Sequence, residues 1–312
     1  MPTDWPELPY ADLKDTCETL RLWTQIVGKI RLARSPWLNH SWQVTLYVTA
    51  RGLSTSLIPH PSGGFDLEFD FTDQVLRLRT SWGPAADIAL RPQSVAAFYG
   101  QVMDALAGAG APTTINVTPS EFPDPVTLFP EDHAPRAYDP EVAHRFWRAL
   151  VRVDEVFKLF RSGFLGKASP VHLFWGSFDL AVTRFSGRRA PSHPGGVPHL
   201  PDAVAREAYS HEVSSAGFWP GGPGAEEAVF YSYAYPEPAG FRTAAAGPSQ
   251  ARYEAELGEF VLPYEEVRTA ADPDAVLLGF LNSTYAAAAD AAKWDRVALE
   301  CAPGQPGKPR PV

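Results

Sequence analysis

The stretch SPVHLFWGSFDLAVTRFSGRR, Ser169–Arg189, decides the fold and raises the question of function. Its alternation of apolar residues with other side chains is typical of a strand. His172 and Asp179 stand inside this strand, and burying a polar or charged side chain without a partner costs several kcal/mol. We therefore expect these two side chains to line a site, in the simplest case a pocket for a small molecule.

The two rows of side chains in this strand differ in character, because successive residues point to opposite faces of a sheet. The apolar row, expected to face helices, is Phe178, Leu180 and Val182; the opposite row is Ser177, Asp179, Ala181 and Thr183. A solvated row usually carries more Lys and Glu than this one does. The row therefore either lines a pocket or belongs to an ordinary solvent-exposed face of the sheet.

An earlier stretch of the chain contains similar short motifs in the same order. Residues 28–52 read GKIRLARSPWLNHSWQVTLYVTARG, and residues 166–187 read GKASPVHLFWGSFDLAVTRFSG. Both contain Gly-Lys, Ser-Pro, His, Trp and Val-Thr in the same order, in each case beside a predicted helix. Such internal repeats fix the architecture of a protein. The alternative is that two helix–strand junctions converged on similar turns.

The repeat predicts an α+β fold built of two similar halves, about 8–130 and 139–296, related by pseudo-twofold symmetry. Each half would run helix, antiparallel sheet, helix. The two would form a single integral domain over residues 1–300, followed by a disordered tail at 301–312. Helices are predicted at 11–32, 92–108, 140–162 and 273–294, and strands at 42–50, 65–71, 74–81, 113–119, within 169–189, at 209–215 and at 228–235.

Composition narrows the class of protein. The 312 residues carry a net charge of −9, which argues against a nucleic-acid binder, because such a protein needs a basic surface. No apolar run reaches the ~18 residues of a membrane span, and the start MPTDWPELPY carries no export signal. Two cysteines are too few for a disulfide framework. We expect a soluble cytoplasmic protein of bacterial type, whose 31 prolines and 24 glycines form long loops.

The candidate site residues come from both halves. The predicted catalytic residues are His172, Asp179 and His211, and the predicted substrate-binding residues are Arg184, His40, Tyr47, Trp175 and Tyr233. Histidine and aspartate exchange protons well when burial moves their pKa values toward neutrality, and a guanidinium suits a carboxylate or phosphate. The alternative for each is a structural role, as a hydrogen-bonded core histidine, a core aromatic or a solvated arginine.

No metal is predicted, and the cofactor stays open. His172, His211 and a carboxylate would make a two-histidine, one-carboxylate set, but no ligand spacing in the sequence supports it. The insertion at 187–225 is rich in Gly and Pro, and we expect it to cover the pocket. The alternative is a passive surface loop.

Four strings carry a family resemblance: QIVGKIRL at 25–32, LYVTARGL at 46–53, HLFWGSFDLAVTRFSGRRAP at 172–191 and SHEVSSAGFWPGG at 210–222. They are similar to a family of bacterial proteins catalogued as domain of unknown function 5996, over nearly the whole chain to about residue 294. The resemblance implies one integral domain of bacterial, cytoplasmic type. It implies no activity, cofactor or catalytic residue.

These features favour an enzyme that acts on a small molecule by acid–base chemistry in an aromatic-walled pocket. The molecule would be anionic if Arg184 orients it. The alternative is a non-catalytic binding or sensor protein that uses the same cavity, and a structural role for the Pro-rich loops comes third. The expected partner is a small-molecule ligand, with no nucleic acid and no membrane. Substrate, reaction and oligomeric state stay open.

Overall fold

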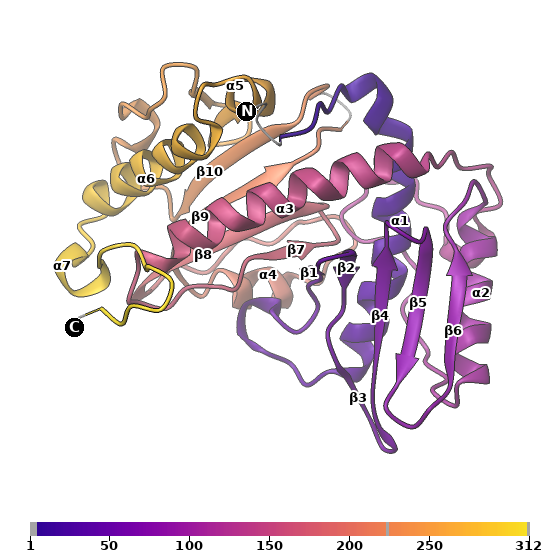
Figure 1. Ribbon diagram of the computed structural model, residues 1–312. Coiled ribbons are helices and arrows are strands. Elements are labelled where there is room, and N and C mark those ends of the chain that lie inside the picture. The colour runs from indigo at the N-terminus through magenta and orange to yellow at the C-terminus, as the bar shows by residue number, and fades with distance from the viewer. Residues whose placement is uncertain (1–4, 223–224, 311–312) are drawn as a thin grey trace.

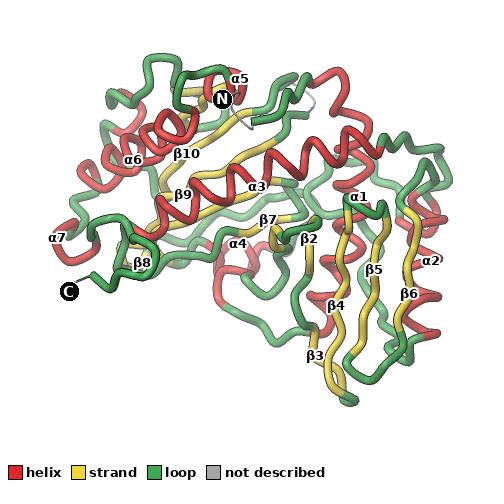
Figure 2. The backbone as a smooth tube through the Cα atoms, in the orientation of Figure 1, coloured by secondary structure: helices red, strands yellow, loops and turns green. Residues whose placement is uncertain are grey.

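A computed structural model describes residues 5–222 and 225–310. Within them, helices are combined with two antiparallel sheets of six strands each, which confirms the α+β class. Figure 1 shows the elements of the two sheets in separate parts of the molecule, with the long helices α1 and α3 between and across them. Long loops join the elements (Figure 2), as the proline and glycine content predicts.

The first sheet lies between helix α1 (Tyr10–Arg34) and helix α2 (Val95–Gly108) in the chain. Its strands are β1 (Tyr47–Val48), β2 (Gly52–Ser54), β3 (Ile58–His60), β4 (Gly63–Asp70), β5 (Val75–Thr80) and β6 (Ala85–Ala89). The order across the sheet is β1-β2-β4-β5-β6, and β3 pairs with β4. The strands predicted at 65–71 and 74–81 correspond to β4 and β5.

The inner face of the first sheet is apolar and packs on the two helices. Leu67 of β4 lies opposite Leu78 of β5, and both are buried. Phe69 packs on Phe98 of α2 with ring centroids 6.3 Å apart, and Phe98 stacks on Trp23 of α1 at 4.4 Å. The period of two in the strands and the apolar stripes of the helices therefore build one common core.

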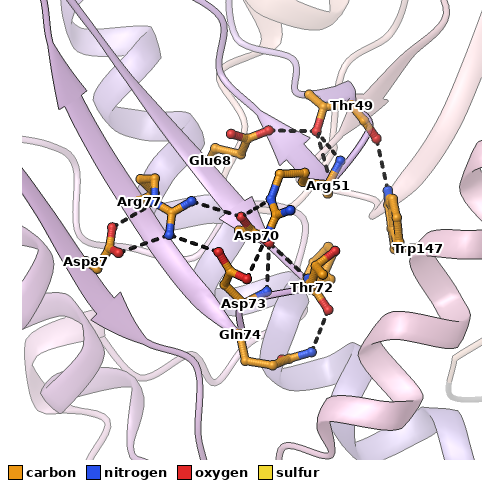
Figure 3. A network of polar contacts seen from close by, with 12 residues as sticks. Thr49, Arg51, Glu68, Asp70, Thr72, Asp73, Gln74, Arg77, Asp87 and Trp147 are labelled. Atoms are coloured by element: carbon orange, nitrogen blue, oxygen red, sulfur yellow. Dashed lines mark hydrogen bonds and ion pairs between the residues drawn. The ribbon is translucent and has the colours of Figure 1, made fainter.

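The outer face of the first sheet is covered by ion pairs. Figure 3 shows Asp70 between Arg51 and Arg77. The Asp70 carboxylate is fully buried, pairs with both guanidinium groups, and accepts hydrogen bonds from the backbone amides of Thr72 and Asp73. The charges on this face thus have a structural role, because Asp70, held by the two arginines, binds the backbone of the turn between β4 and β5.

The second sheet lies between helix α3 (Pro140–Ser162) and helix α6 (Pro273–Ala291) in the chain. Its strands are β7 (His172–Phe174), β8 (Asp179–Arg189), β9 (His211–Trp219), β10 (Val229–Tyr235), β11 (Arg252–Glu254) and β12 (Glu259–Pro263), in the order β11-β12-β10-β9-β8-β7. The short helices are η1 (Asn39–Ser41), η2 (Phe129–Glu131), α4 (Asp202–Ala208), η3 (Phe241–Thr243), α5 (Tyr264–Arg268) and α7 (Arg296–Leu299).

Both long helices of this unit begin where the sequence predicts. The side chain of Asp139 caps the first turn of α3, and Pro140 occupies a favoured first-turn position. Asp272 and Pro273 do the same for α6. The predicted helix at 273–294 ends earlier, at Ala291, and the chain then turns toward α7.

Helices cover one face of the second sheet. Helix α3 contacts β8, and α6 contacts β9 and β10. In Figure 1, α3 lies in front of the second sheet. Arg184 of β8 donates a hydrogen bond to the Phe160 carbonyl of α3, so the row of Arg184 faces the helices. Leu180 and Val182 share that row. Asp179 therefore lies on the opposite face, which we call the free face.

The two sheets are joined beside the edge strands β1 and β7. Leu46, just before β1, and Leu173 of β7 form an antiparallel bridge, with N···O distances of 2.9 and 2.8 Å. We call this junction the seam. Because the bridge joins the edge strands of both sheets, it fixes the side chains next to Leu46 relative to those next to Leu173.

Three predicted strands differ from the structure. The single strand predicted within 169–189 is a hairpin, in which a turn at 175–178 joins β7 to β8. Residues 113–119 form no strand, because the Asn116 side chain accepts a hydrogen bond from the Thr118 amide and makes a local turn. The strand predicted at 42–50 is reduced to Tyr47–Val48, since the chain before it forms η1 and a turn. Strand β10 agrees closely with the prediction at 228–235, whereas β9 runs to Trp219, beyond the predicted end at residue 215.

The motifs repeated in the sequence do not lie in equivalent secondary-structure elements of the two halves. Gly28 and Lys29 lie inside α1, whereas Gly166 and Lys167 follow the end of α3. His172 is in β7, whereas His40 is in η1. Both units nevertheless run helix, antiparallel sheet, helix in the chain. The pseudo-twofold relation stays a prediction.

Two further observations concern the surface of the molecule. None of the helices among the described residues is both long enough and apolar enough to span a membrane. Residues 301–310 lie against the end of α3, where the Gly304 amide donates to Ser162 Oγ at 2.9 Å and Arg310 donates to the Ser162 and Ala302 carbonyls.

Candidate functional site

Small side chains occupy the middle of the free face. Ala181 of β8 pairs with Gly217 of β9, and Thr183 pairs with Ser215. Larger side chains from neighbouring strands can therefore lean over this middle part without a clash. Tyr231 of β10, which pairs with Gly217, is one that does.

Tyr231 reaches Asp179 across an intervening strand. A Cβ atom on Gly217 would lie 2.3 Å from Tyr231 Cζ and Oη, so the tyrosine ring lies directly on this glycine. The Tyr231 hydroxyl donates to Asp179 Oδ2, and the Ser177 hydroxyl donates to Oδ1. Burial raises the pKa of Asp179, and the two hydroxyl donors oppose that rise. Asp179 thus has hydrogen-bond donors on both oxygens.

A second pair of tyrosines lies on the same face. Tyr233 alternates with Tyr231 along β10, and its hydroxyl lies 2.8 Å from the hydroxyl of Tyr209. Tyr209 comes from the insertion, directly after α4, and stacks on His193 with ring centroids 4.7 Å apart. His193 also packs on Tyr235 at 5.2 Å. The insertion therefore lies over the tyrosine row of β10.

The predicted insertion is shorter than 187–225, because residues 187–189 belong to β8 and residues 211–219 form β9. The excursion itself runs from 190 to 210 and contains α4. The Pro191 carbonyl accepts a hydrogen bond from the Tyr235 hydroxyl at 3.1 Å, and the Pro198 carbonyl accepts one from the Glu121 amide at 2.8 Å. Its placement fits a cover, whereas a role in ligand exchange stays a prediction.

Glu121 enters this region from the loop between α2 and α3. A Cβ atom on Gly176 would lie 1.9 Å from Glu121 Oε1, so the carboxylate packs on the Gly176 backbone. Arg21 of α1 ties both segments together, since it donates to the Gly176 carbonyl at 2.8 Å and to the Glu121 carbonyl at 2.9 Å. Burial and the negative charge of Asp179 raise the pKa of Glu121 to about 7.

Glu259 is the third carboxylate of this face. Val261 pairs with Tyr231, so strand alternation places Glu259 beside Tyr233 on the free face. Burial, with a contribution from Asp179, raises the pKa of Glu259 to about 7. We call Glu121, Asp179, Tyr209, Tyr231, Tyr233 and Glu259 the tyrosine–carboxylate cluster. Among the residues the structure describes, neither Glu121 nor Glu259 forms an ion pair.

A buried lysine stands near this cluster. Lys29 of α1 is 4% exposed and donates to Ser120 Oγ at 2.9 Å. Its ammonium lies 5.6 Å from the centre of the Trp175 ring. Burial lowers the pKa of Lys29 to about 8, and the nearby charge of Glu121 opposes this shift. Glu121, Glu259 and the neighbouring Lys29 thus have pKa values moved by burial to about 7, about 7 and about 8.

His172 lies at the seam, in a different environment. Its ring is 1% exposed and packs near Trp42, Tyr47 and Phe174, with ring centroids 6.4, 6.2 and 4.8 Å away. Burial, and the charges of two arginines, lower its pKa to about 3, so the ring is neutral at pH 7. His172 therefore carries no extra proton to donate in acid–base catalysis near neutral pH. Tyr47, which was predicted to bind a ligand, lies beside His172 at the seam.

His40 and His211 come together at the other end of the free face. Their ring centroids are 6.0 Å apart. His40 is held by the Ala208 carbonyl at 2.7 Å from Nδ1 and by Lys167 Nζ at 2.5 Å from Nε2. Burial lowers the pKa of His40. The two histidines connect η1 to α4 and β9. His211 pairs with Arg189 at the far end of β8, away from Asp179 and from Ala181, the partner of His172.

Two predicted ligand residues lie outside these groups. Arg184 is 3% exposed, faces the helices, and sits over the ring of Phe160 at 3.5 Å and that of Tyr285 at 4.4 Å. It does not share a face with Asp179. Trp175 is buried and donates to the Val44 carbonyl at 2.8 Å, which connects β7 to the segment before β1.

Several residues of the site were not predicted from the sequence. Glu121 and Glu259 stand in a loop and at the start of a short strand, far from any recognisable motif. Tyr231 belongs to a stripe that more often marks a core, and of that stripe only Tyr233 was predicted to bind a ligand. The alternation Tyr231, Tyr233, Tyr235 was the one available signal. The residues that the structure describes contain no group of three or more His, Cys, Asp or Glu side chains arranged to hold a metal ion.

Residues 5–301 match the model of a family of unknown function, DUF5996. The chain belongs to this family. Because the match covers nearly the whole chain, it includes both sheets and every residue of the tyrosine–carboxylate cluster. Searches of curated proteins and of solved structures found no match.

Proposed function

We propose that this DUF5996 protein is an enzyme that performs acid–base chemistry on a small molecule bound over the tyrosine–carboxylate cluster. One observation carries the proposal: Asp179 is held by Ser177 and Tyr231 on the face of the sheet that the helices leave free. A carboxylate kept by two hydroxyl donors at a fixed position is suited to orient a substrate or a reacting tyrosine.

The other members of the cluster supply proton-transfer groups. Glu121 and Glu259 have pKa values raised to about 7 by burial, and a general acid or base works best when its pKa lies near the working pH. Perturbed carboxyl groups of this kind concentrate at functional sites. In this proposal Glu121 and Glu259 exchange protons with the substrate, while Tyr209 and Tyr233 form the aromatic wall.

The predicted catalytic histidines take other roles. The low pKa of His172 suits a neutral hydrogen-bonding group, not a proton donor. His211 packs against His40 next to the cover. We propose that the 190–210 excursion closes over the bound molecule, supported by its contacts with Tyr235 and Glu121.

The test compares turnover in Tyr231→Phe with turnover in Tyr235→Phe. Both tyrosines lie on the same face of β10, but only Tyr231 contacts Asp179. Purified protein is incubated with a cell extract of small metabolites, and conversion is followed by mass spectrometry. We expect a metabolite to be consumed by the wild type and by Tyr235→Phe, and at least about tenfold more slowly by Tyr231→Phe. Equal rates in all three would refute the proposal.

A non-catalytic binding protein is the second candidate, and the stack of His193, Tyr209 and Tyr235 over the free face favours it, because aromatic walls bind ligands without chemistry. In the same experiment it predicts metabolites that copurify with the protein but are not converted.

Two broader proposals accompany this one. The common order helix, sheet, helix and the bridge at the seam support two halves related by a pseudo-twofold axis, and superposing residues 11–110 on 140–295 tests it.

The two cysteines, Cys17 and Cys301, form no disulfide. Free thiols support a reducing, cytoplasmic location, which cell fractionation tests.

A further inference from the structure

Two arginines lie near His172 at the seam. Arg31 of α1 is 9% exposed, donates to the Thr45 carbonyl, and places its guanidinium 5.2 Å from the centre of the Tyr47 ring. Arg161 at the end of α3 donates from Nε to the Ser169 carbonyl at 2.5 Å. Both positive charges act on the His172 ring, and no carboxylate contributes to its pKa shift.

Arg31 and Arg161 lack a carboxylate partner in the part of the chain that the structure describes. Burying an unpaired charge is costly, so native proteins pair buried cations with anions.

Buried donors at the seam are also left without partners. Among the described residues, Arg31 Nε and His172 Nδ1 are buried and have no hydrogen-bond partner. Such orphaned polar atoms are rare in folded proteins and call for an explanation. Acceptor oxygens of a bound ligand would give such atoms partners.

Exposure increases from His172 toward the surface. His172 and Arg31 are buried, the rings of Trp42 and Tyr47 are half-buried, and Arg161 is exposed. Buried cationic and hydrogen-bonding groups therefore lie beside two half-buried aromatic rings, and a second cation is exposed.

We infer that the seam binds a small oxyanion, a phosphate or carboxylate group, between Arg31 and Arg161 beside His172. A guanidinium matches such a group with two parallel N–H donors. The neutral His172 ring can add one N–H donor from Nδ1. Tyr47 holds the Arg31 guanidinium in place through its ring face.

The position of the seam suggests what the anion belongs to. On the ladder between β7 and β8, His172 pairs with Ala181 and Phe174 pairs with Asp179, so the seam and the tyrosine–carboxylate cluster are neighbours on the free face. An anionic substrate could be anchored at the seam while its reacting part lies near Asp179. This assignment rests on the proposed function, whereas binding of the anion itself does not.

The experiment measures anion binding without turnover. Wild-type protein is titrated by calorimetry with inorganic phosphate and, separately, with acetate, against sodium chloride at equal ionic strength. We expect saturable binding of at least one oxyanion that chloride does not reproduce. Phosphate as the preferred anion would indicate a phosphorylated ligand, and acetate would indicate a carboxylate.

Variants then locate the site. Arg161 is exposed, so Arg161→Gln should fold normally and weaken binding of the preferred oxyanion by about tenfold. Lys158→Gln, which removes another exposed cation of α3, should bind as the wild type does. Arg31→Lys keeps the buried charge but loses the planar pair of donors, and it should also weaken binding.

Two results would overturn the inference: neither anion binds better than chloride, or Arg161→Gln and Lys158→Gln both match the wild type. Tyr231→Phe separates this inference from the proposed function. It should bind the oxyanion normally even where its turnover is lost, because Tyr231 contacts Asp179 and not the arginines.

Discussion

The hydroxyl of Tyr231 donates a hydrogen bond to Asp179 Oδ2 across a neighbouring strand, over the Cα atom of Gly217. Tyrosine and aspartate are 52 residues apart in the chain and belong to β10 and β8. The contact exists because β9 contributes no side chain at Gly217. It explains why Asp179 can stand in an otherwise apolar strand: its two oxygens have hydroxyl partners on the free face.

Gly217→Ala should separate this pair. The new methyl group would lie within 2.5 Å of the Tyr231 ring and force it away from Asp179. We expect the free energy of unfolding, measured by urea denaturation, to fall by about 1–3 kcal/mol. The control is Gly279→Ala in α6, where a Cβ meets nothing within 4 Å. There the helix should gain roughly 0.5–1 kcal/mol. Equal effects at both positions would contradict the packing argument.

Asp179→Asn distinguishes a functional from a structural carboxylate. Because burial raises the pKa of Asp179, ionising it in the folded state costs free energy. The amide removes that cost and can still bond to Ser177 and Tyr231. We expect the melting temperature, measured by calorimetry, to stay the same or rise, while metabolite turnover is lost. A clear drop in melting temperature with turnover intact would show that Asp179 is structural.

Glu121→Gln should change the pH dependence of stability. The folded-state pKa of about 7 lies above the ordinary value of 4.5. The folded protein therefore keeps a proton that the unfolded chain has released, and the free energy of unfolding falls as pH rises from 4.5 to 7. Removing the carboxyl group should make this fall smaller in denaturation series across that range. Glu256→Gln, at an exposed position, controls for the loss of one charge. The same slope in Glu121→Gln and wild type would count against the buried acid.

His172→Gln should protect the protein against acid. Because the pKa of His172 is lowered from 6.5 to about 3, the unfolded chain binds a proton that the folded protein rejects between these values. Stability therefore falls as pH drops below 6.5, and part of that fall should disappear in the variant. Thermal unfolding at pH 7, 6, 5 and 4 measures it, with the exposed His133→Gln as control. An unchanged acid sensitivity would mean that His172 is accessible to protons in the folded state.

Asp70→Asn should destabilise the first sheet. Burial opposes ionisation of Asp70, but the hydrogen bonds from Arg51 and from the amides of Asp73 and Thr72 outweigh it, so the pKa of Asp70 is lowered. We expect a loss of roughly 2–4 kcal/mol at pH 7 by urea denaturation. The half-exposed Asp87→Asn, which also contacts Arg77, should cost less than about 1 kcal/mol. Similar losses would show that burial of Asp70 contributes little.

Local features of the chain were sufficient to predict the long helices and the longest strands, but not the short strands β2, β3, β6, β11 and β12. Asp139-Pro140 predicts the start of α3 because capping and the fixed backbone angle of proline act within one turn. The alternation in 178–183 likewise predicts that Asp179 and Leu180 face opposite ways, since a strand imposes a period of two. The same alternation separates Asp179 from Arg184.

The composition of the site depended on contacts that no local pattern encodes. The sequence allowed Arg184 to contact either a ligand or a helix. Because α3 packs on β8, Arg184 donates a hydrogen bond to the Phe160 carbonyl of that helix. Glu121 and Glu259 reach Asp179 only because a loop and a short strand converge on the free face. Arg31 reaches His172 because the Leu46–Leu173 bridge brings the two sheets together. Helix caps and strand periodicity act between neighbours in the chain, whereas these encounters depend on how whole sheets and helices pack.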